Sequence, residues 1–373
     1  MNYAVLISTA VAGAVLCLAP AAAAAELATS PATQSAAQSS ALILPQPKEG
    51  RRRPLVVVVG QNAGAELTDF VIPYGVLKDS GVADVRALST TEGPVRLLRG
   101  VLVAADQTIS AFDQAEPAGA DIVIVPAQAS PDDAVLIAWL RAQSDRGAVI
   151  VSVCEGARVV AKAGLFYGRR ATSHWSSLEA LEKSYPETDW VRDRRYVQDG
   201  PLISTTGVTA SIPVSLALVE AIGGRQAAMA TAERLGVVRW DASHRTADFS
   251  LSRTDFMHAV VRVLAIWNHE KIELPVSDGM DEIDMALRGD VWGRSLRASV
   301  VTTSTDTAPV VSERGLVILP EHQPQPGRFV IPEGTGTTVD RLDEAVDGMG
   351  RRYGPLGRRL ALSALEYSPA PAR

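Results

Sequence analysis

The chain has 373 residues, of which 47% are hydrophobic and 21% are charged. Such a chain can bury a substantial core, in one large domain or two smaller ones. Its formal net charge is −6, and its arginine clusters, such as 51–53, are short. The chain therefore lacks the basic footprint that nucleic-acid-binding proteins carry, and we expect no nucleic-acid partner.

Residues 1–25 have the features of a secretory signal peptide. From residue 3 onward they carry no charged side chain, and they end in the A-x-A motif Ala23-Ala24-Ala25 before Glu26. We expect cleavage there and a periplasmic or secreted mature protein. The alternative is an uncleaved membrane anchor, because the apolar run is almost long enough to span a bilayer and no Lys or Arg precedes it.

The sequence contains two cysteines, and only one of them lies outside the predicted signal peptide. Cys17 follows Leu16, where a lipoprotein would have a small residue, so we expect no lipid attachment there. Cleavage leaves Cys154 as the one cysteine of the mature chain, which excludes an internal disulfide. A lone thiol of this kind is either functional or buried and inert, and spacing alone leaves both interpretations open.

Strands and helices alternate after a flexible linker, which is predicted over 26–53 from its Ser, Ala, Gln and Pro content. Continuous apolar runs are typical of strands buried on both faces of a parallel sheet. The alternation predicts a flavodoxin-like, doubly wound α/β domain over 54–236, with its site at the carboxyl ends of the strands. The predicted strands are 55–59, 85–88, 101–104, 121–126 and 148–153, and the predicted helices are 69–80, 132–145 and 158–163.

Cys154 lies at the predicted turn from the strand at 148–153 into the helix that follows. Small residues surround it in the stretch S-V-C-E-G-A, 152–157. A sharp turn of this kind is typical of a nucleophile elbow, which exposes a reactive side chain at the edge of a sheet. The N-terminus of the following helix favours the thiolate, so we expect Cys154 to have a low pKa.

Three stretches resemble the ThiJ/PfpI (DJ-one) superfamily. They are V-S-V-C-E-G-A-R-V-V-A-K-A-G-L-F-Y-G-R-R-A-T-S-H-W (151–175), D-G-P-L-I-S-T-T-G-V-T-A-S-I-P (199–213) and E-L-T-D-F-V-I-P (66–73). The resemblance covers roughly 54–236 and is nearest to the branch that contains isonitrile hydratases and the sensor domains of AraC-type regulators. It implies a class I glutamine amidotransferase-like fold.

The resemblance also implies roles for individual residues. Cys154 matches the nucleophile, Asp69 matches the acid that shares a proton with it, and His174 matches a histidine near it. A carboxyl group beside a thiolate is expected to have a raised pKa and to act as a proton donor or shuttle. Without the family, Asp69 is equally explained by the dipole of its helix, and His174 beside Trp175 by a structural role.

The substrate-binding edge of the site is expected to include Glu155, Gly156, Thr206 and Gly207, although turn and packing roles explain the last two as well. Glu155 stands where isonitrile hydratases have Thr and where PfpI-type peptidases have His. No His-x-Glu pair follows the elbow, which argues against glutamine hydrolysis. The specific activities of these relatives are therefore not transferred to this chain.

Two classes of function remain. The first is an exported, cysteine-dependent hydratase or hydrolase that acts on a small electrophilic compound. The second is a non-catalytic module that senses a ligand or an oxidant through Cys154. A transcription factor is the weakest option, because no helix-turn-helix region is evident. The sequence indicates no metal and no cofactor, and the expected partner is a small molecule.

The rest of the chain is predicted to be a helical connector over 237–270 and a truncated repeat of the same domain over 271–373. A shift of 215 residues places Asp284 opposite Asp69 and Pro309 opposite Pro94. The tail from Ala361 on resembles the closing segment of the family's domain. We expect the repeat to be non-catalytic and the protein to form either a homodimer or an intramolecular pseudo-dimer. An independent appendage is the alternative.

Overall fold

The computed structural model describes residues 41–369. The predicted signal peptide, Cys17 and most of the predicted linker lie outside the described residues, so cleavage and export stay predictions.

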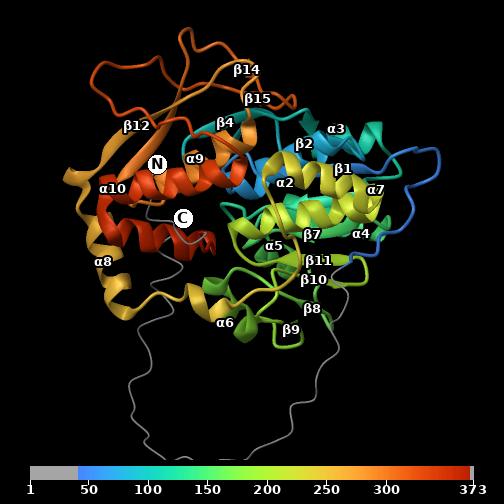
Figure 1. The fold of residues 1–373 in the computed structure, drawn as a ribbon. Helices are drawn as coiled ribbons and strands as arrows, with labels where there is room; N and C mark the ends of the chain where they lie inside the picture. Colours follow the sequence, from blue (N-terminus) through green and yellow to red (C-terminus); the bar gives the residue numbers. More distant parts are fainter. Residues whose placement is uncertain (1–40, 370–373) are drawn as a thin grey trace, which may run out of the picture. The chain divides into compact units, whose positions relative to one another are not determined.

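A seven-stranded sheet in the order β10-β11-β7-β6-β1-β2-β5 forms the centre of the first domain (Figure 1). Its neighbouring strands are parallel, except for the pair β10 and β11. This confirms the predicted α/β fold with a mostly parallel sheet. The strands are β1 (Leu55–Gly60), β2 (Asp84–Ser89), β5 (Gln107–Thr108), β6 (Ile122–Val125), β7 (Val149–Ser152), β10 (Tyr196–Asp199) and β11 (Leu202–Thr205).

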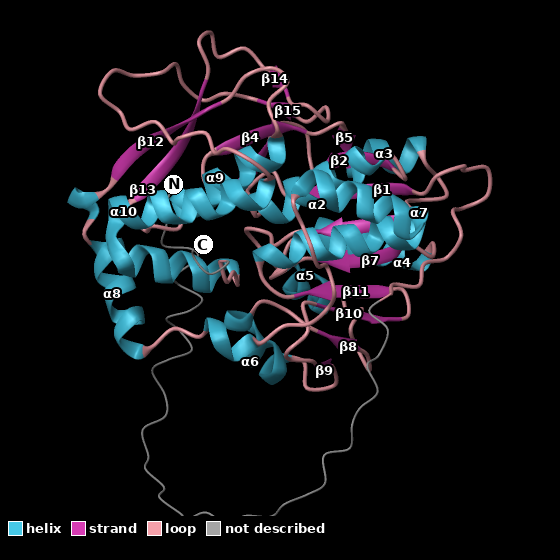
Figure 2. Cartoon of the chain, viewed as in Figure 1, coloured by secondary structure: helices cyan, strands magenta, loops and turns pink. Residues whose placement is uncertain are grey.

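Helices cover both faces of this sheet, as Figure 2 shows. Val56 and Val58 of β1 belong to the hydrophobic core that contains α2 and α7, whereas Val57 and Val59 belong to the core that contains α3, α4 and α5. Because successive side chains of a strand point to opposite faces, a continuous valine run supplies both cores at once. These helices are α2 (Leu67–Ser80), α3 (Ile109–Ala115), α4 (Ala134–Asp145), α5 (Gly156–Lys162) and α7 (Ser211–Leu235).

The long predicted elements agree with the structure to within a few residues. The helix predicted over 158–163 begins earlier, at Gly156, directly after the elbow. The strand predicted over 101–104 is β4 (Val101–Ala104). Sequence reasoning did not place β5 or the short strands β3 (Val95–Leu97), β8 (Arg170–Ala171) and β9 (Asp189–Trp190), because two or three residues carry no periodicity. It also did not place the longer elements α3, α6 (Trp175–Ser184), α7, β10 and β11.

The last part of the predicted flexible linker is packed against the domain. The backbone N–H of Lys48 donates to Asp121 at 2.7 Å, and Arg51 pairs with Asp121 at 2.8 Å and with Glu116 at 2.9 Å. The Leu42 side chain is buried. The linker prediction therefore fails over 42–53, because its basic residues find buried or half-buried carboxylates that composition alone did not reveal.

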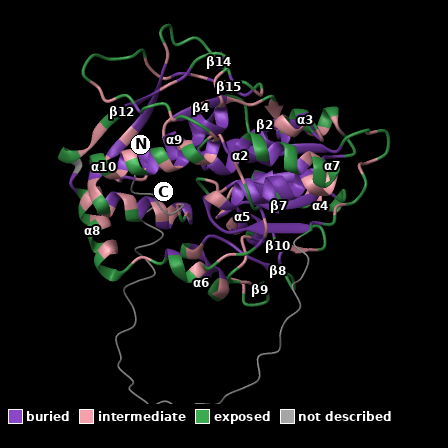
Figure 3. Cartoon of the chain, viewed as in Figure 1, coloured by how far each residue is buried: buried purple, intermediate pink, exposed green. Residues whose placement is uncertain are grey.

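The region after 236 contains a connector and a second strand-helix-strand unit. Two 3₁₀ turns, η2 (Thr246–Phe249) and η3 (Ile266–Asn268), flank α8 (Arg253–Leu264), which has no buried residue (Figure 3). The second unit comprises β12 (Glu270–Pro275), α9 (Glu282–Gly293), β13 (Ala298–Thr303), β14 (Val310–Val311) and β15 (Val317–Ile318), and α10 (Thr338–Leu365) follows it.

The second unit repeats the order β1-α2-β2-β3-β4 of the first. β12, α9 and β14 begin at 270, 282 and 310, each 215 residues after β1, α2 and β3, which begin at 55, 67 and 95. β12 and β13 are parallel, as β1 and β2 are. Asp284 lies in the first turn of its helix, as Asp69 does. Asp284 thus lies at the start of a helix that follows a strand, as the predicted duplication requires. The common origin of the two stretches stays a prediction.

The two units share one core and one sheet. β15 pairs with β4, so that β14-β15-β4-β3 form a single four-stranded sheet. α9 packs against α2 so closely that a Cβ atom on Gly75 would come within 2.7 Å of Cγ1 of Ile283. α7 packs against α2, and α10 packs against α9. Residues of both units line one hydrophobic core, which argues against an independent appendage, and the pseudo-dimer stays a prediction.

Among the described residues, one helical stretch, Val208–Leu235, is long and apolar enough to cross a membrane. It includes α7, and 61% of its most apolar window is buried inside the protein. Because α7 packs against α2 in the core, its apolar composition is explained by burial within the domain.

We expect the shared core to make the two units unfold together. Ile283 is fully buried, so Ile283→Ala should lower the free energy of unfolding by about 2–4 kcal/mol, through lost burial and a cavity. Val330→Ala is the matched control, because Val330 is 47% exposed. Denaturant unfolding, followed by fluorescence and circular dichroism, measures both. Two separate transitions in the wild-type protein would contradict a shared core.

Candidate functional site

Cys154 lies at a strained turn where β7 ends and α5 begins. Its φ angle is 56°, in the left-handed region that non-glycine residues rarely adopt. The backbone N–H of Cys154 donates to Oγ1 of Thr205 at 3.1 Å, which fixes the turn to the end of β11. A Cβ atom on Gly156 would come within 2.0 Å of the Val125 carbonyl oxygen. The predicted elbow geometry is therefore confirmed, and it explains the glycine two residues after the cysteine.

The thiol is buried among acidic side chains. Cys154 is 5% exposed. Burial raises the pKa of its thiol well above the ordinary value, and the charges of Asp69 and then Glu155 raise it further. This contradicts the expectation of a low-pKa thiolate. The helix N-terminus favours the thiolate, but desolvation and the surrounding carboxyl groups disfavour a negative charge on sulfur more strongly.

Asp69 lies in the first turn of α2 and is fully buried. Its Oδ2 accepts the backbone N–H of Ala127 at 3.2 Å, and its Oδ1 has no hydrogen-bond partner among the described residues. Burial, followed by the neighbouring Glu66, raises the pKa of Asp69 well above its ordinary value. The expected direction is confirmed, and its main cause is burial. A protonated carboxyl group places an O–H donor on the otherwise unpaired oxygen.

Glu66 links Asp69 to a cation from the second unit. Its Oε2 accepts the backbone N–H of Asp69 at 2.7 Å and the hydroxyl of Thr68 at 2.8 Å, so it caps the N-terminus of α2. Its Oε1 accepts Nη2 of Arg294 at 3.1 Å. Burial raises the pKa of the Glu66 carboxyl, the Asp290 charge adds to this, and Arg294 opposes it.

Arg294 follows α9 directly and is held by a second carboxylate. Its Nε donates to Oδ2 of Asp290 at 2.7 Å, and Asp290 also accepts Nε of Arg99 at 3.2 Å. Burial opposes the charge of the guanidinium, yet Asp290 and Glu66 raise the pKa of Arg294. Because Arg294 also interacts electrostatically with Cys154, the second unit supplies the cation of the first unit's site.

His174, His244 and the segment after α10 form a second group of buried polar contacts. His174 caps α6, with Nδ1 2.6 Å from Oγ of Ser176, and its Nε2 lies 3.2 Å from the carbonyl oxygen of Ala364. Oε1 of Glu366 accepts the backbone N–H of Trp175 at 3.0 Å. Nε2 of His244 lies 2.7 Å from Oε2 of the same carboxylate.

The structure places the other predicted site residues around this centre. Glu155 receives a long hydrogen bond of 3.5 Å from Ser176 and lies 3.9 Å from Arg158. Thr206 is buried, and its hydroxyl has no partner among the described residues. A Cβ atom on Gly207 would come within 2.7 Å of the Glu366 side chain. Glu155 therefore lies near α6 and Gly207 lies against Glu366, while the roles of all these residues in binding stay predictions.

Sequence reasoning missed Arg294, His244 and Glu366. The chain has no His-x-Glu pair after the elbow, but tertiary folding brings two histidines to a glutamate from distant positions. No local motif marks any of these residues, because each is supplied by an element far along the chain. The described residues contain no cluster of His, Cys, Asp and Glu with the arrangement of a metal site.

Residues 55–221 match the DJ-1/PfpI family, which is the family that the elbow and its flanking stretches resemble. A small protein of unknown role from Streptomyces lividans is 35% identical over 140 residues, which cover 36% of this chain and 96% of that protein. The chain belongs to the DJ-1/PfpI family. The second unit lies outside the matched residues.

Two relatives with named roles also match the family domain. The HTH-type transcriptional regulator CdhR of Pseudomonas aeruginosa is 34% identical over 163 residues, or 42% of this chain and 47% of the regulator. The isonitrile hydratase of Pseudomonas putida is 33% identical over 110 residues, or 28% of this chain and 46% of the hydratase. The chain thus spans about half the length of each of these two relatives.

The buried acids should give Cys154 an unusual pH dependence. We expect its alkylation by iodoacetamide to have a midpoint above about pH 8.5, the value of a free cysteine, because burial and the acidic neighbours raise its pKa. Asp69→Asn should move the midpoint downward. Peptide mass spectrometry measures the rates, with Cys154→Ser as the background. A midpoint below pH 7 in the wild type would restore the low-pKa interpretation.

Removing the buried cation should destabilise the protein in a pH-dependent way. Arg294→Ala removes the guanidinium that pairs with Glu66 and leaves Asp290 paired with Arg99 alone, and it should cost about 3–5 kcal/mol near pH 7. The loss should shrink toward pH 5, because the raised pKa of Glu66 rises further without Arg294 and its neutral form is tolerated in the core.

The matched control for Arg294 is Arg53→Ala. Arg53 pairs with Asp84 on the surface, where both side chains are about half exposed, and this change should cost less than about 1 kcal/mol. Chemical denaturation at the two pH values measures both variants. An equal loss at pH 5 and pH 7 would contradict the role of Glu66 ionisation.

Proposed function

We propose that the chain is a cysteine-dependent hydratase or hydrolase that acts on a small electrophilic compound. The observation that carries this proposal is the strained elbow cysteine next to a fully buried carboxyl group with one unpaired oxygen. Strain of this kind persists only where the surrounding structure enforces it, and it gathers at functional sites. The isonitrile hydratase relative supports the same class of chemistry.

The neutral Cys154–Asp69 pair supports a mechanism without a resting thiolate. Sulfur bonds to an electrophilic carbon that is multiply bonded to nitrogen or oxygen. As the C–S bond forms, the thiol proton passes to one oxygen of Asp69 and the proton on the other oxygen passes to the substrate. Water then attacks the carbon, the C–S bond breaks, and a proton returns to sulfur. The net reaction adds water, and nothing is oxidised or reduced.

Glu66 and Arg294 position the proton carrier in this mechanism. Glu66 accepts the backbone N–H of Asp69, and Arg294 neutralises Glu66. Neither side chain needs to touch the substrate. Because Arg294 also interacts with Cys154, its charge stabilises negative charge that develops on sulfur as the thiol proton leaves.

A sensing role is the second candidate. The burial of Cys154 limits access of a substrate, and the regulator CdhR is similar over the family domain. A single covalent adduct or a reversible oxidation of Cys154 would then be the signal. The similarity to a helix-turn-helix-type regulator also argues for a nucleic-acid partner, which the sequence analysis did not expect. This match covers 47% of the regulator.

Turnover separates the two candidates. We expect steady product formation from isonitriles or glyoxals, with product in excess of enzyme, and no product from Cys154→Ser. Asp69→Asn should abolish turnover and yet leave alkylation of Cys154 at neutral pH unchanged or faster, because it removes an acid that raises the thiol pKa. Product that stops at one equivalent, with sulfur still modified in the mass spectrum, would favour the sensor.

We also propose that the mature protein is exported. The uncharged segment 3–25 and its A-x-A end support this proposal. Cell fractionation with N-terminal sequencing tests it, and we expect an N-terminus at Glu26 in the exported fraction. A full-length chain in the cytoplasm would overturn it.

A further inference from the structure

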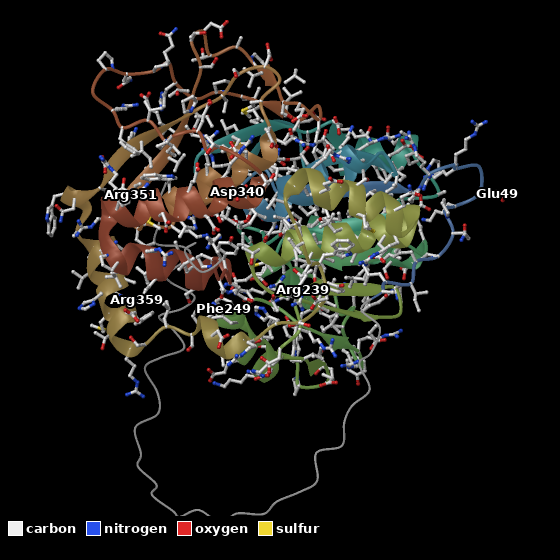
Figure 4. The ribbon with its side chains drawn as sticks, in the orientation of Figure 1. Glu49, Arg239, Phe249, Asp340, Arg351 and Arg359 are labelled. Atoms are coloured by element: carbon white, nitrogen blue, oxygen red, sulfur yellow. The ribbon has the colours of Figure 1, made fainter. Side chains whose placement is uncertain are left out.

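Residues 363–366 are hydrogen-bonded to three separate parts of the first domain and the connector. The indole N–H of Trp175 donates to the carbonyl oxygen of Ser363 at 2.9 Å, and Oγ1 of Thr209 donates to the backbone oxygen of Glu366 at 2.8 Å. The hydroxyl of Ser363 also donates to the backbone of Phe249, which Figure 4 labels near the end of α10. Several independent contacts thus hold this segment in place.

The Glu366 side chain reaches a buried set of donors. Its side chain is 1% exposed. Oε1 accepts the backbone N–H of Trp175, at the N-terminus of the ten-residue helix α6, at 3.0 Å and lies 3.8 Å from Nε2 of His174. Oε2 lies 2.7 Å from Nε2 of His244. Although burial alone would raise the pKa of Glu366, His244, His174 and the Trp175 N–H hold it below the ordinary value.

Glu366 and His244 form a buried pair. Oε2 of Glu366 and Nε2 of His244 lie 2.7 Å apart, and neither atom has another hydrogen-bond partner among the described residues. Glu366 itself has φ = 52°, in the left-handed region. A residue that served only as the C-cap of α10 would not need a charged side chain at this position. The donors around Glu366 therefore have the features of a receptor for a carboxylate.

This receptor adjoins the reactive sulfur. Ser173, the residue before His174, donates from its hydroxyl to the carbonyl oxygen of Cys154 at 3.1 Å. Gly207, two residues after the Thr205 side chain that binds the Cys154 N–H, lies against the Glu366 side chain. The charge of Glu366 is also among those that raise the pKa of the Cys154 thiol. A ligand carboxylate bound in place of Glu366 would therefore hold its neighbouring carbons beside sulfur.

We propose that Trp175 N–H, His174 and His244 form a carboxylate-binding subsite beside Cys154, which Glu366 occupies at rest and a small carboxylate-bearing electrophile takes over. The inference rests on the proposed function for the chemistry that follows binding. It adds the substrate class: a small compound that carries a carboxylate as well as its electrophilic carbon. Because Glu366 fills the subsite at rest, a ligand can bind there only after Glu366 moves away.

Alkylation with two isosteric reagents tests the subsite. Iodoacetate carries a carboxylate, and iodoacetamide is its neutral counterpart. In Glu366→Ala, we expect the ratio of iodoacetate to iodoacetamide rates at Cys154 to rise about tenfold over the wild type, because charge-assisted hydrogen bonds then hold the reagent. Adding His244→Ala to Glu366→Ala should remove most of that gain. Both rates are measured by peptide mass spectrometry, with Cys154→Ser as the background.

The matched control is Tyr367→Phe. It removes the 2.7 Å hydrogen bond from Tyr367 to Asp343 and loosens the tail, but it leaves Glu366 in place. It should accelerate both reagents equally or leave both unchanged. Circular dichroism and thermal unfolding show whether Glu366→Ala folds. If it does not, Glu366→Gln, which keeps the shape of the side chain, replaces it, and the ratio of iodoacetate to iodoacetamide rates should again rise.

The other outcomes overturn the subsite in distinct ways. Equal acceleration of both alkylation reactions in Glu366→Ala would mean that Glu366 only blocks access to Cys154 and that no carboxylate subsite is present. Slower alkylation by both reagents in Glu366→Ala and Glu366→Gln would make Glu366 part of a histidine–glutamate pair that activates the thiol. Alkylation requires no turnover, so a raised iodoacetate ratio without product formation would retain the subsite and reject the enzyme proposal.

Discussion

The buried ion pair between Glu66 and Arg294 joins the two halves of the molecule and organises the site. Glu66 caps the helix that carries Asp69, and Arg294 ends the helix that carries Asp284 and Asp290. Two charges removed from water need further hydrogen bonds to be tolerated. Here Thr68 donates to Glu66, Arg294 donates to Asp290, and Arg99 donates to Asp290. The position of Asp69 beside the elbow cysteine therefore depends on a residue more than two hundred positions away.

This constraint sets the electrostatic character of the site. The Arg294 guanidinium faces several carboxyl groups and a thiol in a buried region, so full ionisation of every acid is unfavourable. The raised pKa values of Glu66, Asp69 and Cys154 all express this imbalance. A resting thiolate at Cys154 is therefore disfavoured in this site.

The second unit gives the fold a partner surface within one chain. An α/β layer with two strands and one helix cannot bury its own apolar face, and here β15 extends the hairpin of the first unit while α9 packs on α2. The helix that follows, α10, then carries the end of the chain back to the elbow. Completion of the core and closure of the site are thus consequences of the same packing.

The sequence by itself determined the α/β class and the elbow, because continuous valine runs and a cysteine flanked by small residues are local signals, whereas the raised pKa of Asp69 was expected only from the family resemblance. It also placed the second strand-helix-strand unit, through the 215-residue shift. Only the tertiary structure decided that Cys154 is buried among acids and that Arg294, His244 and Glu366 belong to the site. Burial and long-range ion pairs depend on which elements pack together, and the residues around a turn do not encode that choice.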